Sequence, residues 1–469
     1  MTELAVAERI DAPGARTSGW APLFVVLAGT FVTFLDFFIV NVALPSVGTE
    51  LHATDSELSL VVAGFGLTFA AGMITGGRLG DLYGRRRMFR LGLALFTLTS
   101  AACGLAPNIA VLIAARMAQG ASGALLTPQV LALLGSVYTG ARRDKAFAGF
   151  GFAMGIAGVL GQLIGGLLIH ADIAGAGWRS IFLINVPVGL VVVPLVTRTV
   201  PESRGDAGQR LDLVGALIGT LTVAALVMPL VEGHDRGWPL WTWLLLAAAP
   251  LLGAAFVAHQ RRRTRVGVEP LVHLGLFRVR TFSVGVVAGL TFALVPSGLF
   301  FVLALYLQGG RGYSALFSGV VFVAVGVGYF AALLVAPRLA TALGHQVLAL
   351  GAAVVGVGAL LLALAAGSGS ALDLVPGLAA AGFGIGAVLV PLASTVLAGV
   401  EPTHAGAAAG TLTTFQQVGG ALGIAVLGNV FFGAVGRSTV HAFTVATVVL
   451  AGLALLTVAL VQVLHRRAH

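Results

Sequence analysis

One acidic side chain lies in an unusual place for a charge. Asp36 stands inside a long apolar run that begins near Trp20 and ends with LDFFIVNVALP, residues 35–45. An ionised carboxylate at the centre of a membrane helix costs about 2.5–3.5 kcal/mol on insertion scales. Along the rest of the sequence no second acid lies so deep in an apolar run. A lone acid held there serves a proton, an ion or a substrate, so Asp36 is the first candidate functional residue.

A basic side chain, Arg116, lies inside the fourth apolar run. Its guanidinium stays protonated in proteins, so within a membrane it needs an acidic or carbonyl partner. At about 1.5 Å per helical residue, Asp36 and Arg116 each lie about 12–14 Å from the outer end of their runs. At this similar depth the two charges could meet, directly or through water, and a change in their distance would then load and release a proton. The alternative is a static, structural ion pair.

The composition of the chain places these residues in a lipid bilayer. The 469 residues are 58% hydrophobic and only 10% charged, and the mean hydropathy is +1.00. A soluble globular chain carries about 25% charged residues, so this chain cannot hide its apolar surface in a water-soluble core. The one cysteine, Cys103, excludes an internal disulfide, and no Cys or His cluster has metal-ligand spacing. We expect an all-α polytopic membrane protein without a metal or cofactor.

Fourteen apolar stretches are long enough to cross a bilayer, which takes about 20 mostly apolar residues. The seventh and eighth are the weakest, because they flank the polar break GHDRGWP at 233–239; without them the count is twelve. The predicted spans are 21–45, 57–77, 88–106, 109–138, 146–170, 179–199, 212–231, 241–259, 282–307, 315–337, 346–366, 373–399, 405–433 and 441–464.

The basic residues are distributed unevenly over the segments between these spans. With the N-terminus inside, most of the 27 lysines and arginines fall in inner segments, including the basic loop 260–280. This positive-inside pattern predicts a protein of the cell (inner) membrane with both termini cytoplasmic. The net charge of +9 then reflects orientation in the membrane and not a nucleic-acid partner. The outer segments hold only Arg179, Arg236, Arg311 and Arg437.

An internal repeat divides the chain into two related halves. Arg78 and Gly84, after the second span, recur as Arg338 and Gly344 after the tenth. Two homologous halves with a site at their interface are a common transporter design. The expected organisation is a cytoplasmic tail (1–20), an N-terminal six-helix bundle (21–200), a linker with two inserted spans and the basic loop (201–280), a C-terminal six-helix bundle (281–464) and a cytoplasmic tail (465–469).

The loop after the second span has the sequence GRLGDLYGRRR, residues 77–87. Its glycines allow a tight turn, and its acid can cap a helix or pair with a nearby arginine. The loop resembles the G-x-L-x-D-x-x-G-R-[KR] signature of the major facilitator superfamily, where it acts as a latch between the halves. The residues that match the latch are Gly77, Asp81, Gly84, Arg85 and Arg86.

Further stretches resemble the fourteen-span drug:proton antiporters of that superfamily. They are LDFFIVNVALP (35–45), WRSIFLINVPVGL (178–190) and the R-x-x-Q-G motif at 116–120. In the fifth span, GIAGVLGQLIGG resembles the antiporter motif associated with export, although glutamine replaces its proline. Helix packing alone would also explain these glycines. The motif residues are Gly158, Gly161, Gln162, Gly165 and Gly166.

The resemblance implies the major facilitator fold, with two pseudo-symmetric six-helix bundles plus two inserted spans. It also implies a substrate cavity between the halves and a proton-coupling role for Asp36 and Arg116. Intramembrane amides are also used simply to bond neighbouring helices, at about 0.6–2 kcal/mol each. The candidates for the cavity are Asn41, Phe37, Gln119, Gln129, Gln308, Gln416 and Gln417, with Gln162 and Asn429 as further amides.

These features predict a proton-coupled exporter of small hydrophobic or amphipathic molecules, such as drugs or antibiotics, that works as a monomer. Two alternatives stay open: a proton-coupled carrier of one metabolite in either direction, and a non-transporting receptor or scaffold. The sequence has no Walker loop and no set of nucleophile, base and orienting residue. We therefore expect the proton gradient to be the energy source and do not expect an enzyme.

Overall fold

The computed structural model describes residues 19–204, 211–234, 236–344, 346–397, 399–401 and 405–465. Within these ranges the regular structure is helical and no strand occurs, as predicted for an all-α membrane protein. Nearly all of the two predicted tails lies outside the described residues. The α-helices are α1 (Ala21–Leu51), α2 (Asp55–Tyr83), α3 (Arg85–Gly104), α4 (Ile109–Val137), α5 (Gly140–Ala171), α6 (Ser180–Leu183), α7 (Asn185–Thr199), α8 (Leu213–Glu232), α9 (Leu240–Arg265), α10 (Arg280–Leu305), α11 (Ala315–Leu343), α12 (Gln346–Ala365), α13 (Val375–Leu397), α14 (Ala405–Val435) and α15 (Thr439–His465).

The number of membrane spans agrees with the prediction. Among the described residues, 13 helical segments are long and apolar enough to cross a bilayer, with α6 and α7 together forming one of them. The third predicted span, α3, has 20 residues, and the arginines of the segment RRRMFR at its start lower its hydropathy. Because α3 packs against α4 and α7 inside the same bundle, it completes the set of fourteen.

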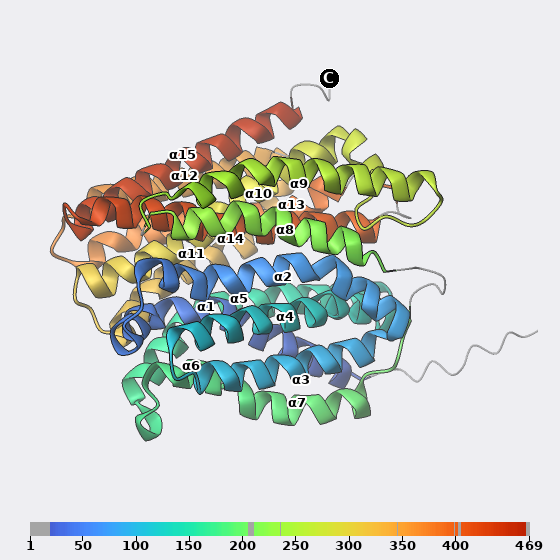
Figure 1. Ribbon diagram of the computed structural model, residues 1–469, viewed down its shortest axis with the longest axis horizontal. Coiled ribbons are helices and arrows are strands. Elements are labelled where there is room, and N and C mark those ends of the chain that lie inside the picture. Colours follow the sequence, from blue (N-terminus) through green and yellow to red (C-terminus); the bar gives the residue numbers. More distant parts are fainter. Residues whose placement is uncertain are drawn as a thin grey trace, which may run out of the picture.

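The helices form two groups that lie against each other. Helices α1–α7 occupy the lower part of Figure 1 and α10–α15 the upper part. Two seams join the groups, since α2 packs against α14 and α5 packs against α11. The inserted hairpin of α8 and α9 lies outside the seam of α2 and α14, and α8 packs against both of these helices. This arrangement is the predicted fold, two six-helix bundles plus two inserted spans.

The two ends of the helix bundle differ in their polar contacts, and we name each end by one charged residue. At the Glu50 end, the side chain of Glu50 accepts a hydrogen bond from Trp178 Nε1 at 2.7 Å and pairs with Arg179. At the Arg85 end lies the loop between α2 and α3, together with the last residues of α15. Both ends of the described chain therefore lie at the Arg85 end.

The central helices are packed more tightly at the Glu50 end. Three stretches are buried without interruption: residues 39–44 of α1, residues 61–67 of α2, and residues 298–307, which cover the end of α10 and the start of the helical turn that follows it. In the part of α2 nearest the Arg85 end, 71–83, the buried residues are only Met73, Gly76 and Gly80. The seam between the halves is thus sealed at the Glu50 end and looser at the Arg85 end.

Candidate functional site

Asp36 and Arg116 lie side by side in the interior of the first half. Arg116 Nη1 donates to Asp36 Oδ2 at 2.5 Å, and both side chains are 0% exposed. The carboxylate comes from α1 and the guanidinium from α4. The structure therefore brings the two residues predicted to couple protons into direct contact.

Neutral polar side chains complete the cluster around Asp36. Gln119 Nε2 and Asn185 Nδ2 each donate to Asp36 Oδ1 at 2.9 Å. Both amides also donate to Ser100 Oγ, at 3.0 and 2.9 Å respectively, and this hydroxyl donates onward to Phe182 O at 2.9 Å. Each of these contacts of Asp36 is with an N–H donor, which suits an ionised carboxylate because that group only accepts hydrogen bonds.

The guanidinium of Arg116 is held by a carbonyl, an amide and two aromatic rings. Its Nε donates to Val61 O at 3.0 Å, and its Nη1 donates also to Gln119 Oε1 at 2.7 Å. The guanidinium carbon lies 4.4 Å from the ring centre of Phe65 and 5.6 Å from that of Phe182. Such cation–π contacts are stronger where water is excluded. Nη2 is buried without a hydrogen-bond partner among the described residues, so one donor of the guanidinium is unused in this arrangement.

The cluster has the chemistry of a site for one proton. In the observed arrangement the negative Asp36 balances the positive Arg116 in a fully buried place. A proton on Asp36 would leave the guanidinium without its counter-charge, and an uncompensated buried charge is strongly unfavourable. Protonation therefore favours a different arrangement of the helices that carry these groups.

Ser100 and Asn185 belong to this cluster but were not among the predicted site residues. Asn185 lies within the stretch 178–190 that resembles the antiporters, and Ser100 lies in α3. The available signal was a hydrogen-bonding side chain inside an apolar run. That signal is weak, because a neutral polar group in a membrane helix costs far less than a charge.

The loop after α2 is held by contacts with neighbouring parts of the first half, so its predicted role as a latch between the halves stays a prediction. Gly84 has φ +105°, which favours glycine, and a Cβ there would lie 2.8 Å from Glu202 Cδ. The same carboxylate accepts the backbone N–H of Arg86 at 2.9 Å. Within the loop, Arg85 pairs with Asp81 at 2.9 Å. Four of the five predicted latch residues therefore surround one turn that is tied to the end of α7, while Gly77 lies within α2 itself.

A second ion pair ties this loop to the inserted hairpin. Arg78 Nη2 lies 2.6 Å from Glu269 Oε1, in the segment that follows α9. The backbone oxygen of Glu269 accepts from Arg263 Nη2 at 3.0 Å. At the start of the hairpin, Asp212 accepts from His259 Nε2 at 2.8 Å and from Gln260 Nε2 at 3.0 Å. The hairpin is thus anchored at the Arg85 end and holds Glu269 against the loop.

Comparison with known families identifies the chain. A sequence profile of the Major Facilitator Superfamily matches residues 26–424. The chain belongs to the major facilitator superfamily. It is therefore a multi-pass membrane transporter of small molecules, which confirms the resemblance inferred from the loop signature.

Curated relatives within the superfamily include exporters and resistance proteins. The chain is 38% identical over 427 residues to the probable actinorhodin transporter of Streptomyces coelicolor, covering 89% of this chain and 73% of the relative. It is 36% identical over 480 residues to the puromycin resistance protein pur8 of Streptomyces alboniger, covering 95% and 91%. It is 34% identical over 435 residues to the cephamycin export protein CmcT of Amycolatopsis lactamdurans, covering 91% and 88%.

Solved structures of two other transporters share the fold. A bacterial homolog of the human lysosomal transporter Spinster, in an inward-facing and occupied conformation, matches with a TM-score of 0.69 and 15% identity, over 97% of this chain and 98% of that one. A POT family transporter in complex with a thioalcohol-conjugated peptide matches with a TM-score of 0.68 and 16% identity, over 94% and 96%. At this identity the likeness concerns the fold alone.

The pair of Arg78 and Glu269 leads to a testable prediction for this superfamily member. Arg78→Glu and Glu269→Arg should each slow transport by about two- to fivefold, because each places like charges together at a partly exposed site. The double variant, which restores opposite charges, should recover most of the rate. The measurement is substrate transport in reconstituted vesicles. The control is Arg90→Glu, which reverses an exposed charge in the first turns of α3, directly after the same loop. Equal rates in the single and double variants would contradict the prediction.

The glycines of the predicted antiporter motif bring α5 close to both halves of the superfamily fold. Gly158, Gly161 and Gly165 face α1, and a Cβ at Gly165 would lie only 2.6 Å from a side-chain atom of that helix. Gly166 faces α11 in the other half, where a Cβ would lie 2.4 Å from Ala315 O. The motif therefore contributes to the sealed seam at the Glu50 end.

Gly166→Ala should weaken this seam, because the new methyl group meets a backbone carbonyl that cannot turn away. We expect a loss of about 1–3 kcal/mol in stability, the usual cost of overpacking, together with reduced transport. Gly151→Ala is the matched control, since nothing lies within 4 Å of a Cβ at that position of the same helix. Thermal unfolding in detergent and transport in vesicles measure the two effects. Identical behaviour of both variants would refute the role of Gly166.

Several of the amides predicted to line a cavity make bonds between helices. Gln129 Nε2 donates to Gly76 O of α2 at 2.7 Å. Gln162 Nε2 donates to a carbonyl oxygen of α1, also at 2.7 Å. Gln308 Nε2 donates to Val42 O at 2.9 Å and so joins the two halves. Gln119, as described above, belongs to the Asp36 cluster.

The other cavity candidates have different surroundings. Asn41 is 3% exposed and donates to Phe38 O of its own helix at 3.0 Å. The ring of Phe37 lies 5.1 Å from that of Phe38, centre to centre. Gln416 and Gln417 are only partly buried on α14, near the looser end of the seam. These last two side chains are therefore the best placed of the candidates to meet a substrate.

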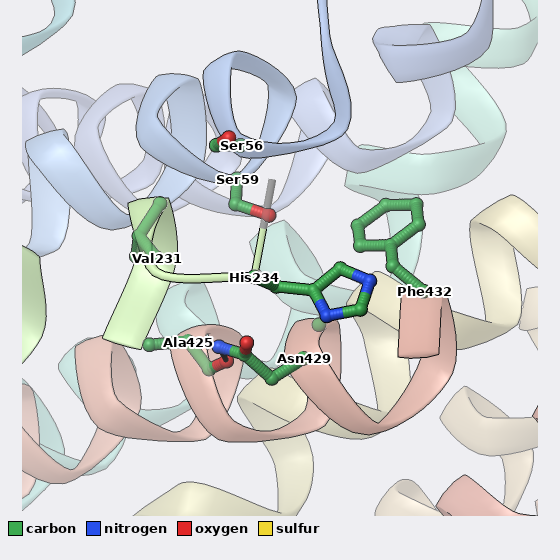
Figure 2. A pocket seen from close by; sticks show the side chains of 8 residues that line it. Ser56, Ser59, Val231, His234, Ala425, Asn429 and Phe432 are labelled. Carbon is green, nitrogen blue, oxygen red and sulfur yellow. Dashed lines mark hydrogen bonds between the residues drawn. The ribbon is translucent and has the colours of Figure 1, made fainter. Parts of the chain in front are cut away.

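A small cavity lies at the Glu50 end where three parts of the chain meet (Figure 2). Its volume of about 10 Å³ has room for about one water molecule and not for a substrate. Asn429 Nδ2 caps the end of α8 by donating to Leu230 O, and its Oδ1 is buried without a partner among the described residues. The residues that line the cavity include Ser56 and Ser59 of α2, His234 after α8, and Asn429 and Phe432 of α14.

Proposed function

We propose that this chain is a proton-coupled exporter that moves antibiotic-like small molecules out of the cell by alternating access. The observation that carries the proposal is the fully buried ion pair of Asp36 and Arg116, at 2.5 Å, inside a superfamily bundle. Intramembrane charges of this kind mark ion and proton pathways in transporters. Relatives named for actinorhodin, puromycin and cephamycin support the choice of substrate class.

The proposal includes an orientation and a division into moving parts. The Glu50 end faces outward and the Arg85 end faces the cytoplasm, because basic residues concentrate in the segments at the latter end. The chain then lies in the cell membrane with both termini cytoplasmic. Residues 21–200 and 281–464 are the two bodies that rock against each other, and 201–280 links them. One chain is sufficient for transport in this proposal, since both bodies that rock belong to it.

The proposed cycle uses Asp36 to exchange a proton for the substrate. A proton that arrives from outside neutralises Asp36 and breaks its balance with Arg116. The halves then rock, the seam at the Glu50 end closes, and the proton leaves Asp36 toward the cytoplasm. Loss of the proton restores the ion pair, and the substrate binds from the loose Arg85 end before the next outward step. Each turn moves protons inward and substrate outward, so the proton gradient is the energy source.

The proposal is tested by proton movement in vesicles that contain the purified protein and a pH-sensitive dye. Addition of actinorhodin, puromycin or a cephamycin should trigger proton flux, and empty vesicles should give none. An imposed proton gradient should in turn drive substrate against its concentration. Substrate movement without proton flux would overturn the coupling. Proton flux with none of these compounds would leave a dedicated metabolite carrier as the better description.

A further inference from the structure

Asn185 lies at the junction of two helices that together belong to one membrane span. Helix α6 ends at Leu183 and α7 begins at Asn185, and Ile184 between them keeps helical dihedral angles of φ −58° and ψ −29°. The side chain of Asn185 is 1% exposed, and its Nδ2 donates at 2.9 Å to both Asp36 Oδ1 and Ser100 Oγ. One amide group thus connects the start of α7 to α1 and α3.

The hydrogen bonds of the cluster leave no acceptor for a proton on Asp36. Oδ1 accepts N–H groups of Asn185 and Gln119, and Oδ2 accepts from Arg116. Ser100 has one hydroxyl hydrogen, which it donates to a backbone oxygen, and its oxygen accepts both amides. A protonated Asp36 would therefore point its O–H at an N–H, so one partner must move away.

Asn185 is held less firmly than the other two partners. Gln119 is fixed also through its Oε1, which accepts from Arg116 at 2.7 Å and lies 3.5 Å from Cys103 Sγ. Arg116 is fixed also by a backbone oxygen of α2. Asn185 has only its two amide hydrogen bonds among the described residues, so no other polar contact keeps its side chain beside Asp36.

We propose that Asn185 is a positioning residue of the proton site, holding the start of α7 on α1 only while Asp36 is ionised. The inference rests on the proposed function, in which Asp36 is the proton carrier. When Asp36 takes a proton, Asn185 leaves, and the start of α7 loses its hydrogen bond to α1. The other ionisable side chains that face Asp36 among the described residues are Arg116 from α4 and the Cys103 thiol from α3. Neither of them forms a hydrogen bond that joins the start of α7 to α1.

The first test measures protonation of Asp36 directly, without transport. Infrared spectra of the full-length protein in lipid vesicles are recorded across a pH series, and the carboxyl band of Asp36 is identified by its absence in Asp36→Asn. Asn185→Leu removes one donor to the ionised carboxylate, so the midpoint of the band should move up by about one pH unit. Gln129→Leu is the matched control, because Gln129 is an equally buried amide that bonds α2 and its own helix instead. Its midpoint should equal that of the wild type.

A second variant guards against a folding defect in Asn185→Leu. Asn185→Asp has nearly the same shape, and a second carboxylate beside Asp36 should move the midpoint further in the same direction. Hydrogen exchange at the α6–α7 junction supplies the structural readout. In the wild type this segment should exchange faster at pH values below the Asp36 midpoint than above it. The control Gln129→Leu, in α4, should show the same pH dependence as the wild type. In Asn185→Leu the faster exchange should be present at every pH.

The outcomes separate this inference from the proposed function. An unchanged midpoint in both Asn185 variants, with a titrating Asp36, would overturn the role of Asn185 and leave proton coupling intact. Absence of substrate-driven proton flux in the wild type would overturn the proposed function, whatever the spectra show. If the Asp36 midpoint rises in the Asn185 variants and the pH profile of transport moves by the same amount, the result would support both the role of Asn185 and the proposed function.

Discussion

Asp36→Asn is expected to reduce substrate-driven proton movement to the level of empty vesicles. The amide keeps the size of the carboxyl group and can still accept from Gln119 and Asn185, but it cannot take up a proton. Substrate binding from the loose end should persist, because the loss concerns the coupled ion and not the cavity. The measurement is the dye signal in vesicles after substrate addition, recorded together with substrate binding.

Two controls make this result specific to proton coupling. Asp36→Glu keeps a titratable carboxyl group and should retain part of the flux, since only its reach toward Arg116 changes. Gln129→Leu removes a buried amide elsewhere in α4 and should retain nearly all of it. If Asp36→Asn moved protons as the wild type does, the ion pair would be a structural feature and the coupling group would lie elsewhere.

Arg116→Ala is expected to lower the free energy of unfolding by about 3–5 kcal/mol, because it leaves a fully buried carboxylate without its partner. Arg116→Lys should recover only part of this loss. A lysine ammonium does not provide the planar set of donors that reaches Val61 O, Gln119 Oε1 and Asp36 Oδ2 together. Unfolding in detergent, followed by heat or denaturant, measures the change.

A double-variant cycle separates the ion pair from ordinary loss of packing. On the Asp36→Asn background no anion is left behind, so Arg116→Ala should cost clearly less than it does in the wild type. Simple addition of the two single costs would show that the charges do not depend on each other. That outcome would also remove the energetic reason for protonation of Asp36 to drive a rearrangement.

Charged residues made much of the fold and part of the site predictable from the sequence. The apolar runs and the positions of the arginines predict the number of membrane spans, because charged side chains are costly inside lipid and therefore lie at the ends of spans. For the same reason Asp36 and Arg116 could be paired in advance, from their similar depth together with the family resemblance of their spans. The glycine-rich loop could be predicted because a turn with φ above zero requires glycine, as at Gly84.

The neutral members of the site could not be predicted in the same way. Ser100 and Asn185 resemble many other polar residues of membrane helices, and their role depends on how α3, α6 and α7 pack around α1. The amides Gln129 and Gln308 illustrate the opposite case. They were chosen as cavity residues by polarity, yet each forms a bond to a neighbouring helix, and only three-dimensional packing distinguishes the two uses.

The position of α8 has a consequence for molecules dissolved in the membrane itself. Because α8 packs against both α2 and α14, it screens that seam from the surrounding lipid, whereas among the described residues neither α8 nor α9 forms a comparable contact with α5 or α11. An oily compound that diffuses sideways within the leaflet therefore meets α8 at one seam and the helices α5 and α11 themselves at the other. We therefore expect compounds that enter sideways from the bilayer to do so at the flank of α5 and α11.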